Sequence, residues 1–184
     1  MRRSLANMRV VAGELRGRLF EAPPGHDTRP TTDKVREAMF NALGSLDLVR
    51  DATVADLFAG SGGLGIEAMS RGAAHVTFVE RDRGALRALR DNLRSLDLER
   101  RSKIVPGDAL VMVAGLDVDL VLADPPYDFD RWPALLAATR ADFVVAEAGR
   151  PLDDLDAPGW EATRTKRYGR TWVTFFERIS PGAS

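Results

Sequence analysis

The chain has 184 residues, of which 45% are hydrophobic and 29% charged, a balance typical of one soluble globular domain. It contains no cysteine, which excludes disulfides and thiolate metal sites, and its two histidines are too few for a metal cluster. No apolar run approaches the roughly 20 residues needed to cross a bilayer, so we expect a cytoplasmic protein without a membrane partner.

The net charge of −1 conceals an uneven distribution. Residues 1–36 hold 8 Lys and Arg against 4 Asp and Glu, residues 161–178 hold 5 against 2, and residues 37–160 hold 13 against 21. Basic ends on an acidic body favour a polyanionic partner, because Lys and Arg gain affinity by neutralising phosphates. The alternative is solubilising surface charge, which explains the charge pattern alone at least as well.

The first part of the chain predicts a small basic β-hairpin. Short β-like runs within residues 8–21 are separated by Gly13 and Gly17, and Pro23-Pro-Gly25 ends them. Pro30-Thr-Thr-Asp33 then supplies cap residues before an apolar pattern of helical spacing begins at Val35. We therefore expect a basic extension at residues 1–30, a candidate for contact with a polyanion, followed by the main domain at residues 31–184.

From Thr53 onward, strand-like and helical segments alternate. The strand-like runs are residues 53–58, 75–80, 103–106, 118–123 and 142–147, and an apolar stripe marks a helix at 82–96. Residues 160–166 and 171–178, joined by Tyr168-Gly169, predict an antiparallel hairpin at the sheet edge. The pattern predicts an α/β fold with a mostly parallel seven-stranded sheet and helices on both faces.

A glycine-rich loop follows the first of these strands. Gly60, Gly62 and Gly65 match the G-x-G-x-x-G pattern of dinucleotide-binding proteins, and Glu80 follows at the end of the next strand. Asp56 argues against a dinucleotide, because a carboxylate would repel a pyrophosphate at this site. S-adenosylmethionine carries a sulfonium and an ammonium and no phosphate, so an acidic residue favours it.

Asp108 follows the third strand of the alternating region. Its carboxylate, with the next backbone amide, could pair with the edge of an adenine ring. It could equally cap the helix that starts near Ala109, and both roles are compatible.

The stretch Asp124-Pro-Pro-Tyr127 ends the fourth strand, where ligands of open α/β sheets bind. Two prolines fix the backbone there. Methylation of an exocyclic amine requires acceptors at its two N–H bonds, which the Asp124 carboxylate and the Pro125 carbonyl could supply while Tyr127 stacks on the base. A plain proline-rich turn is the alternative for so short a match.

These features together resemble a class I, Rossmann-like S-adenosylmethionine-dependent methyltransferase, and more narrowly the RsmD family of bacterial 16S rRNA guanine-N2 methyltransferases. The resemblance extends over nearly all of the chain and rests on the segments Arg9–Arg18, Arg29–Asn41, Asp56–Gly62, Val79–Glu80 and Asp124–Tyr127. The second segment is the most specific, because generic methyltransferases lack it. At Ala12-Gly13, where the family usually has two glycines, the chain departs from the pattern, which leaves the hairpin turn open.

The resemblance implies positions for the functional residues. The cofactor contacts would be Asp56, Phe58, Gly60, Ser61, Gly62, Glu80, Arg81, Asp108 and Ala109. The catalytic residues that hold the guanine amine would be Asp124, Pro125, Pro126 and Tyr127. No metal is implied.

Two further groups of polar residues are candidates for substrate recognition. The RNA-binding candidates are Arg9, Arg16, Arg18, Arg164, Lys166, Arg167 and Arg170, which would contact phosphates while the target base leaves its stack. Polar residues that precede the apolar face of the next helix, namely Arg29, Thr31, Lys34 and Arg36, could form a lid over the cofactor carboxylate or substrate phosphates.

The leading hypothesis is therefore a monomeric guanine-N2 methyltransferase whose partner is 16S rRNA within the 30S subunit or its precursor. A second hypothesis keeps the chemistry and changes the substrate to an adenine amine in DNA or RNA. A non-catalytic RNA-binding protein is opposed by Asp56, Glu80 and Asp124, and an NAD-dependent dehydrogenase by Asp56 and by the lack of chain for a substrate domain.

Overall fold

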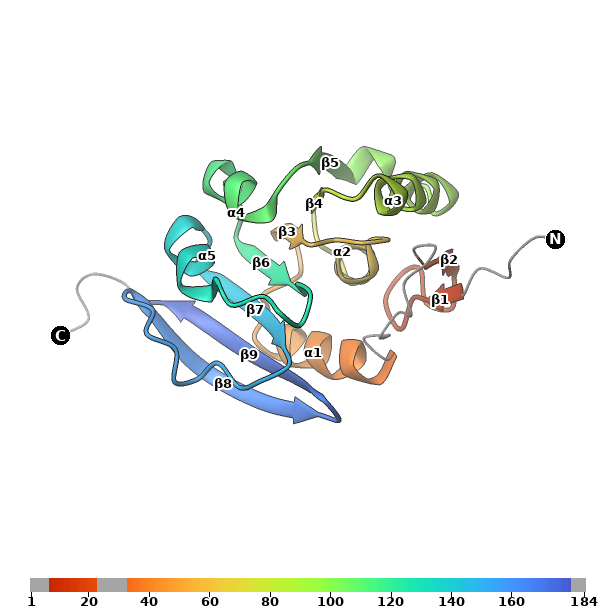
Figure 1. Ribbon diagram of the computed structural model, residues 1–184. Helices are drawn as coiled ribbons and strands as arrows, with labels where there is room; N and C mark the ends of the chain where they lie inside the picture. Colours follow the sequence, from red (N-terminus) through yellow and green to blue (C-terminus); the bar gives the residue numbers. More distant parts are fainter. Residues whose placement is uncertain (1–6, 23–32, 180–184) are drawn as a thin grey trace.

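A seven-stranded sheet forms the centre of the computed structural model, which describes residues 7–22 and 33–179 (Figure 1). Its strands, in spatial order, are β5 (Ser102–Pro106), β4 (His75–Glu80), β3 (Thr53–Leu57), β6 (Leu120–Ala123), β7 (Phe143–Ala148), β9 (Thr171–Arg178) and β8 (Trp160–Tyr168). The first five are parallel, and β9 runs antiparallel to both β7 and β8. The predicted fold class is confirmed.

Helices cover both faces of this sheet (Figure 1). One face packs against α1 (Asp33–Ser45), α2 (Gly63–Ser70) and α3 (Arg83–Ser95), and the other against α4 (Ala109–Met112) and α5 (Trp132–Ala138). Neighbouring residues of one strand serve the two cores alternately: Val54 belongs to the first and Ala55 to the second. Strands buried on both faces explain the continuous apolar runs in the sequence.

The order of the strands determines where a ligand can bind. The chain moves outward from β3 through β4 to β5, and then returns to place β6 on the other side of β3. Two short 3₁₀ helices, η1 (Glu99–Arg101) and η2 (Val113–Gly115), complete the connections around β5. The strand order thus reverses beside β3, and the loops that leave the carboxyl ends of β3, β4, β5 and β6 meet at one edge.

The N-terminal strands β1 (Asn7–Arg9) and β2 (Leu19–Glu21) form a separate two-stranded antiparallel sheet beside α2 and α3 (Figure 1). The predicted hairpin is present with shorter strands than the sequence suggested. Gly13 has φ +84°, and a Cβ atom there would lie 1.8 Å from the Ser70 carbonyl oxygen. The turn therefore requires glycine at position 13, whereas position 12 accepts alanine.

Polar contacts fasten this hairpin to the helices. The two carboxylate oxygens of Glu67 accept hydrogen bonds from the backbone amides of Val11 and Ala12, at 2.9 and 3.0 Å. The side chain of Asn92 pairs with both backbone groups of Glu21, and its amide also donates to the carbonyl of Ser61 at 3.0 Å. Glu67 thus bonds the hairpin to α2, and Asn92 of α3 links it to the loop that precedes α2.

Most predicted elements of the main sheet are found within one or two residues of their expected bounds. The predicted strand at 118–123 starts only at Leu120; just before it, the Asp119 side chain accepts hydrogen bonds from the backbone amide and the hydroxyl of Thr53. The predicted boundary at residue 30, Pro23-Pro-Gly25, Arg29 and Thr31 all lie outside the described residues.

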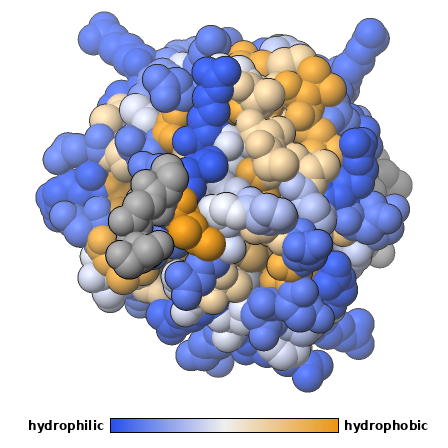
Figure 2. Space-filling view, turned by 90° about the vertical axis from the view of Figure 1, so that its left-hand side faces the viewer, coloured by the Kyte–Doolittle hydropathy of each residue, from blue (hydrophilic) through white to orange (hydrophobic). Residues whose placement is uncertain are grey.

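Among the described residues, no helix has both the length and the apolar character that a bilayer crossing requires. The side of the molecule shown in Figure 2 carries hydrophobic patches that hydrophilic side chains surround and separate.

Candidate active site

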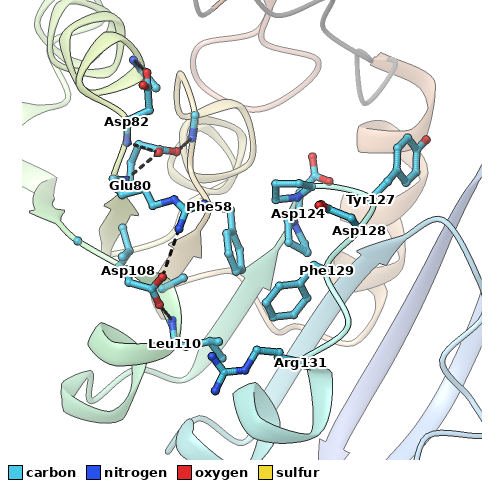
Figure 3. A pocket seen from close by; sticks show the side chains of 18 of the residues that line it. Phe58, Glu80, Asp82, Asp108, Leu110, Asp124, Tyr127, Asp128, Phe129 and Arg131 are labelled. Carbon is cyan, nitrogen blue, oxygen red and sulfur yellow. Dashed lines mark hydrogen bonds and ion pairs between the residues drawn. The ribbon is translucent and has the colours of Figure 1, made fainter.

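A cavity of about 840 Å³ opens at the carboxyl edge of the sheet (Figure 3). The loops after β3, β4, β5 and β6 contribute to its lining, beginning at Phe58, Arg81, Gly107 and Asp124 respectively. The last residues of β4, Val79 and Glu80, also line it. Figure 3 shows Phe58 between the side of the cavity that carries Glu80 and Asp108 and the side that carries Asp124. The four sequence motifs therefore meet in one site.

The loop from β3 to α2 turns tightly. Phe58 has φ +60°, a conformation that costs a bulky side chain roughly 1–3 kcal/mol, and it is held where its ring borders the cavity. Gly62 has φ +93°, and a Cβ atom there would lie 2.7 Å from the Leu89 side chain. Glycine is thus needed at position 62 both for the backbone conformation and for the packing of α3 against the loop.

Asp56 lies beneath this loop and is 1% exposed. Its carboxylate accepts a hydrogen bond from the Gly65 amide at 2.8 Å, which ties the end of β3 to the first turn of α2. Burial raises the pKa of Asp56 well above its usual range; the hydrogen bond from Gly65 acts in the opposite direction, and the charges of Asp124 and Glu80 raise this pKa further. Three carboxylates therefore surround the carboxyl end of β3.

Glu80 holds the loops on its side of the cavity. One carboxylate oxygen accepts from the Gly60 amide at 2.8 Å, and the other accepts from the amides of Arg81 and Asp82, each at 2.8 Å. A single side chain thereby connects the glycine loop with the start of α3. Each carboxylate oxygen has more than one lone pair, so Glu80 can still accept from a ligand hydroxyl.

Asp108 performs the capping role that the sequence left open, and it also borders the cavity. Its carboxylate accepts from the Leu110 amide at 2.9 Å as the N-cap of α4. The other oxygen lies 3.6 Å from Arg81, but both side chains are exposed, so this ion pair adds little stability. Ala109 is buried and lines the same wall.

The loop after β6 forms the opposite wall. The Pro126 carbonyl accepts from the Phe129 amide at 2.9 Å, which closes a turn around Tyr127. The Phe129 ring lies edge-on to Phe58, with 5.2 Å between centroids, and edge-on to Trp132 at 5.0 Å. This aromatic row supports the floor of the cavity.

Ten of the residues expected at the site line the cavity: Phe58, Gly60, Glu80, Arg81, Asp108, Ala109, Asp124, Pro125, Pro126 and Tyr127. The structure places Asp56, Ser61 and Gly62 behind the lining instead. Sequence reasoning missed Asp82, Phe129 and Arg131, which also line the cavity. Of these three, only Phe129 gave a signal in the sequence that could have identified it, because it is an apolar residue within a polar run soon after Tyr127.

Arg36 is not among the residues that line the cavity. It is 1% exposed, and it donates to the backbone carbonyl of Arg9 and, at 2.9 Å, to Asp33. Burial lowers the pKa of Arg36, and the charges of Glu67 and Asp33 oppose that shift. The expectation that Arg36 reaches the cofactor is wrong, because the side chain is used to join α1 to the hairpin.

The basic candidates for RNA contact fall in two separate places. Arg9, Arg16 and Arg18 are exposed on the hairpin beside α2 and α3, where Arg18 also donates to the Ser95 carbonyl at 2.9 Å. The other four lie on β8 and its turn, at the far edge of the sheet. These seven residues are therefore not one continuous cluster.

The β8 residues are further divided between the two faces of the sheet, because successive residues of a strand point to opposite faces. Arg164 pairs with Phe175, which belongs to the core on the α1 face, whereas Arg167 pairs with Trp172 and lies three residues further along β8, on the opposite face. Both guanidinium groups lie over these aromatic partners, at 5.9 and 5.7 Å from the ring centroids.

Comparisons with known proteins agree with this geometry. A family model described as "Conserved hypothetical protein 95" matches residues 8–177. Over 185 residues the chain is 38% identical to YlbH of Bacillus subtilis, a match that covers 93% of this chain and 99% of that protein. It is 33% identical over 191 residues to ribosomal RNA small subunit methyltransferase D of Escherichia coli K12, covering 96% and 93% of the two chains.

Solved structures show the same arrangement. The Escherichia coli protein yhhF superposes with a TM-score of 0.83 at 32% identity, covering 94% of this chain and 98% of that one. A protein of Thermus thermophilus, TTHA0928, superposes with a TM-score of 0.76 at 27% identity, covering 94% and 99%. Because the family model and these relatives match nearly the whole chain, the chain belongs to the conserved hypothetical protein 95 family, which is the RsmD family of methyltransferases.

Proposed function

We propose that this protein transfers a methyl group from S-adenosylmethionine to the exocyclic N2 amine of a guanine in small-subunit rRNA. The observation that carries the proposal is the position of Asp124-Pro-Pro-Tyr127 opposite Glu80 across one cavity. The target amine, held at Asp124-Pro-Pro-Tyr127, and the nucleoside of the cofactor, held at Glu80, would meet in the cavity between these two walls.

The charge of the cavity supports this cofactor. Its lining includes six carboxylate side chains, Glu80, Asp82, Asp108, Asp124, Asp128 and Asp130, and two guanidinium groups, Arg81 and Arg131. The excess of negative charge attracts the sulfonium and ammonium of S-adenosylmethionine and repels the pyrophosphate of a dinucleotide. In this proposal Glu80 would bind the ribose hydroxyls, Asp108 would bind the adenine, and Phe58 would pack against the cofactor; all three line the cavity.

When bound, the cofactor supplies a methyl carbon attached to a sulfonium leaving group. The residues of this chain position the acceptor. Asp124 and the Pro125 carbonyl would accept hydrogen bonds from the two N–H groups of the guanine amine, which directs the nitrogen lone pair toward the methyl carbon. In the proposed transfer a C–N bond would form as the C–S bond breaks, and Asp124 would take one N–H proton of the amine and pass it to water.

The rRNA substrate is inferred from the relatives and from charge. The Escherichia coli relative is named a ribosomal RNA small subunit methyltransferase, and the exposed arginines of the hairpin would bind phosphates of such a substrate. We further propose that residues 1–30 act as the recognition extension on the catalytic domain, and that the enzyme works as a cytoplasmic monomer on 16S rRNA in the 30S subunit or its precursor.

The test is transfer of labelled methyl to three acceptors: undermethylated 30S particles, naked small-subunit rRNA and duplex DNA. The product is digested to nucleosides, and Asp124→Ala is the control. Label in N2-methylguanosine from the particle or the rRNA, lost in the variant, supports the proposal, and the better acceptor identifies the substrate state. Label in methyladenine would overturn guanine as the target base and leave methyl transfer to an exocyclic amine in place. The absence of label in every acceptor would overturn the proposed activity.

A further inference from the structure

Gly149 is the first residue after β7, and it lies against the ring of Tyr127. We propose that Gly149 is a positioning residue that sets the orientation of the Tyr127 ring and thereby the platform for the target base. The platform role rests on the proposed function, whereas the contact between the two residues does not.

The contact leaves no room for a side chain at position 149. A Cβ atom on Gly149 would lie 2.8 Å from Cδ1, 3.2 Å from Cε1 and 3.8 Å from Cγ of Tyr127. Carbon atoms in favourable contact are roughly 3.5–4.0 Å apart. The nearest atom belongs to the part of the ring close to its attachment, so relief of the clash requires the whole ring to rotate.

The backbone of Gly149 does not itself require glycine. Its φ is outside the positive range that the structure shows for seven other glycines, so alanine can adopt the same conformation. Any effect of Gly149→Ala therefore comes from the added methyl group against Tyr127 rather than from backbone strain.

This contact joins the ends of two neighbouring strands. Pro125 and Pro126 fix the backbone that carries Tyr127 after β6, and Gly149 supports the ring from the end of β7. Tyr127 remains 50% exposed and points away from Phe58 and Phe129 (Figure 3), so part of the ring is accessible to a base. A stacking interaction depends on the plane of the ring, so the Gly149 contact that fixes the plane of the Tyr127 ring would also affect substrate binding.

Fluorine NMR tests the contact without any substrate. The chain has only two tyrosines, Tyr127 and Tyr168, so protein labelled with 3-fluorotyrosine should give two resonances, which Tyr127→Phe assigns. Gly149→Ala is expected to shift the Tyr127 resonance and to leave that of Tyr168 in place. The matched control is Gly115→Ala, because a Cβ atom at Gly115 meets nothing within 4 Å. An unchanged Tyr127 resonance in Gly149→Ala would overturn the proposal.

Kinetics test the consequence. Gly149→Ala is expected to lower kcat/KM for methyl transfer about tenfold, on the scale of one stacking interaction, without changing cofactor affinity. In a Tyr127→Ala background the same substitution should change kcat/KM less than about twofold, because the ring it displaces is gone. Equal losses in both backgrounds would contradict positioning through Tyr127.

If the wild-type protein methylates no acceptor, the proposed function fails, and the NMR result still decides whether Gly149 contacts the Tyr127 ring.

Discussion

The Nε atom of Arg36 lies 3.5 Å from Oε2 of Glu67, and both side chains are 1% exposed. Arg71 makes a second ion pair with Glu67, at 2.8 Å, while the hairpin amides of Val11 and Ala12 donate to the same carboxylate. Glu67 thus connects α1, α2 and the N-terminal hairpin at a single buried point.

We expect Glu67→Gln to lower the free energy of unfolding by about 1–3 kcal/mol, because it removes the buried negative charge beside Arg36 and Arg71 and leaves one side-chain oxygen for the two hairpin amides, while Asp33 still pairs with Arg36. Urea denaturation measures the change. Glu99→Gln is the control, since Glu99 is exposed and its ion pair with Arg94 is long, at 3.7 Å. A loss for Glu67→Gln no larger than the loss for Glu99→Gln would refute the role of this network.

The buried Asp56 should make stability depend on pH. Because burial raises its pKa above the ordinary 3.8, the folded protein keeps this proton to higher pH than the unfolded chain does. The contribution of Asp56 is therefore fully present below about pH 4 and is lost as the pH rises through the folded pKa.

Asp56→Asn removes this titration and can keep the hydrogen bond from Gly65 through its side-chain oxygen. We expect its unfolding free energy to decline less than that of the wild type as the pH rises from about 4 to neutrality. Urea unfolding at a series of pH values measures both slopes. Parallel slopes for the two proteins would show that Asp56 does not retain its proton in the folded state.

Asp124→Ala should reduce methyl transfer by about 100-fold or more and leave cofactor affinity nearly unchanged, because in the proposed mechanism it removes an acceptor for the reacting amine. Steady-state kinetics and cofactor titration separate the two effects. Asp154→Ala, at an exposed turn, serves as the control. Comparable losses of cofactor affinity and transfer rate would argue that Asp124 serves binding instead.

Glu80→Gln should weaken cofactor binding about tenfold or more, because a neutral amide with one acceptor oxygen cannot satisfy the amides of Gly60, Arg81 and Asp82 together. Calorimetric titration with S-adenosylhomocysteine gives the affinity. Glu161→Gln, an exposed position on β8, is the control. Retention of wild-type affinity would mean that Glu80 neither shapes nor contacts the cofactor site.

Arg16→Glu should lower RNA affinity and reduce its dependence on salt, while cofactor affinity stays constant, since an exposed arginine of the hairpin would contact phosphate. Arg16 is preferable to Arg18, which also bonds to Ser95. Arg140→Glu, exposed before β7, is the matched charge reversal on another part of the surface. Equal losses of RNA affinity and cofactor affinity would contradict a specific role of the hairpin in RNA recognition.

Local sequence patterns determined the elements and the position of the site. Alternating apolar runs and helical stripes predicted five parallel strands and the C-terminal hairpin, because period and length are properties of neighbouring residues. The motifs at Asp56, Glu80, Asp108 and Asp124 lie at or just after the carboxyl ends of parallel strands, which must meet at one edge of the sheet. Their convergence could therefore be predicted without coordinates.

Only the tertiary structure decided which side chains reach the cavity and which support it. Asp56 has the residue type of a cofactor ligand but lies behind the lining, and Arg36 is used to join α1 to the hairpin. Gly149 follows Tyr127 by 22 positions and shows no local signal, yet the pairing of β6 with β7 brings them together. Such contacts depend on strand register and side-chain packing between distant segments, which local periodicity does not encode.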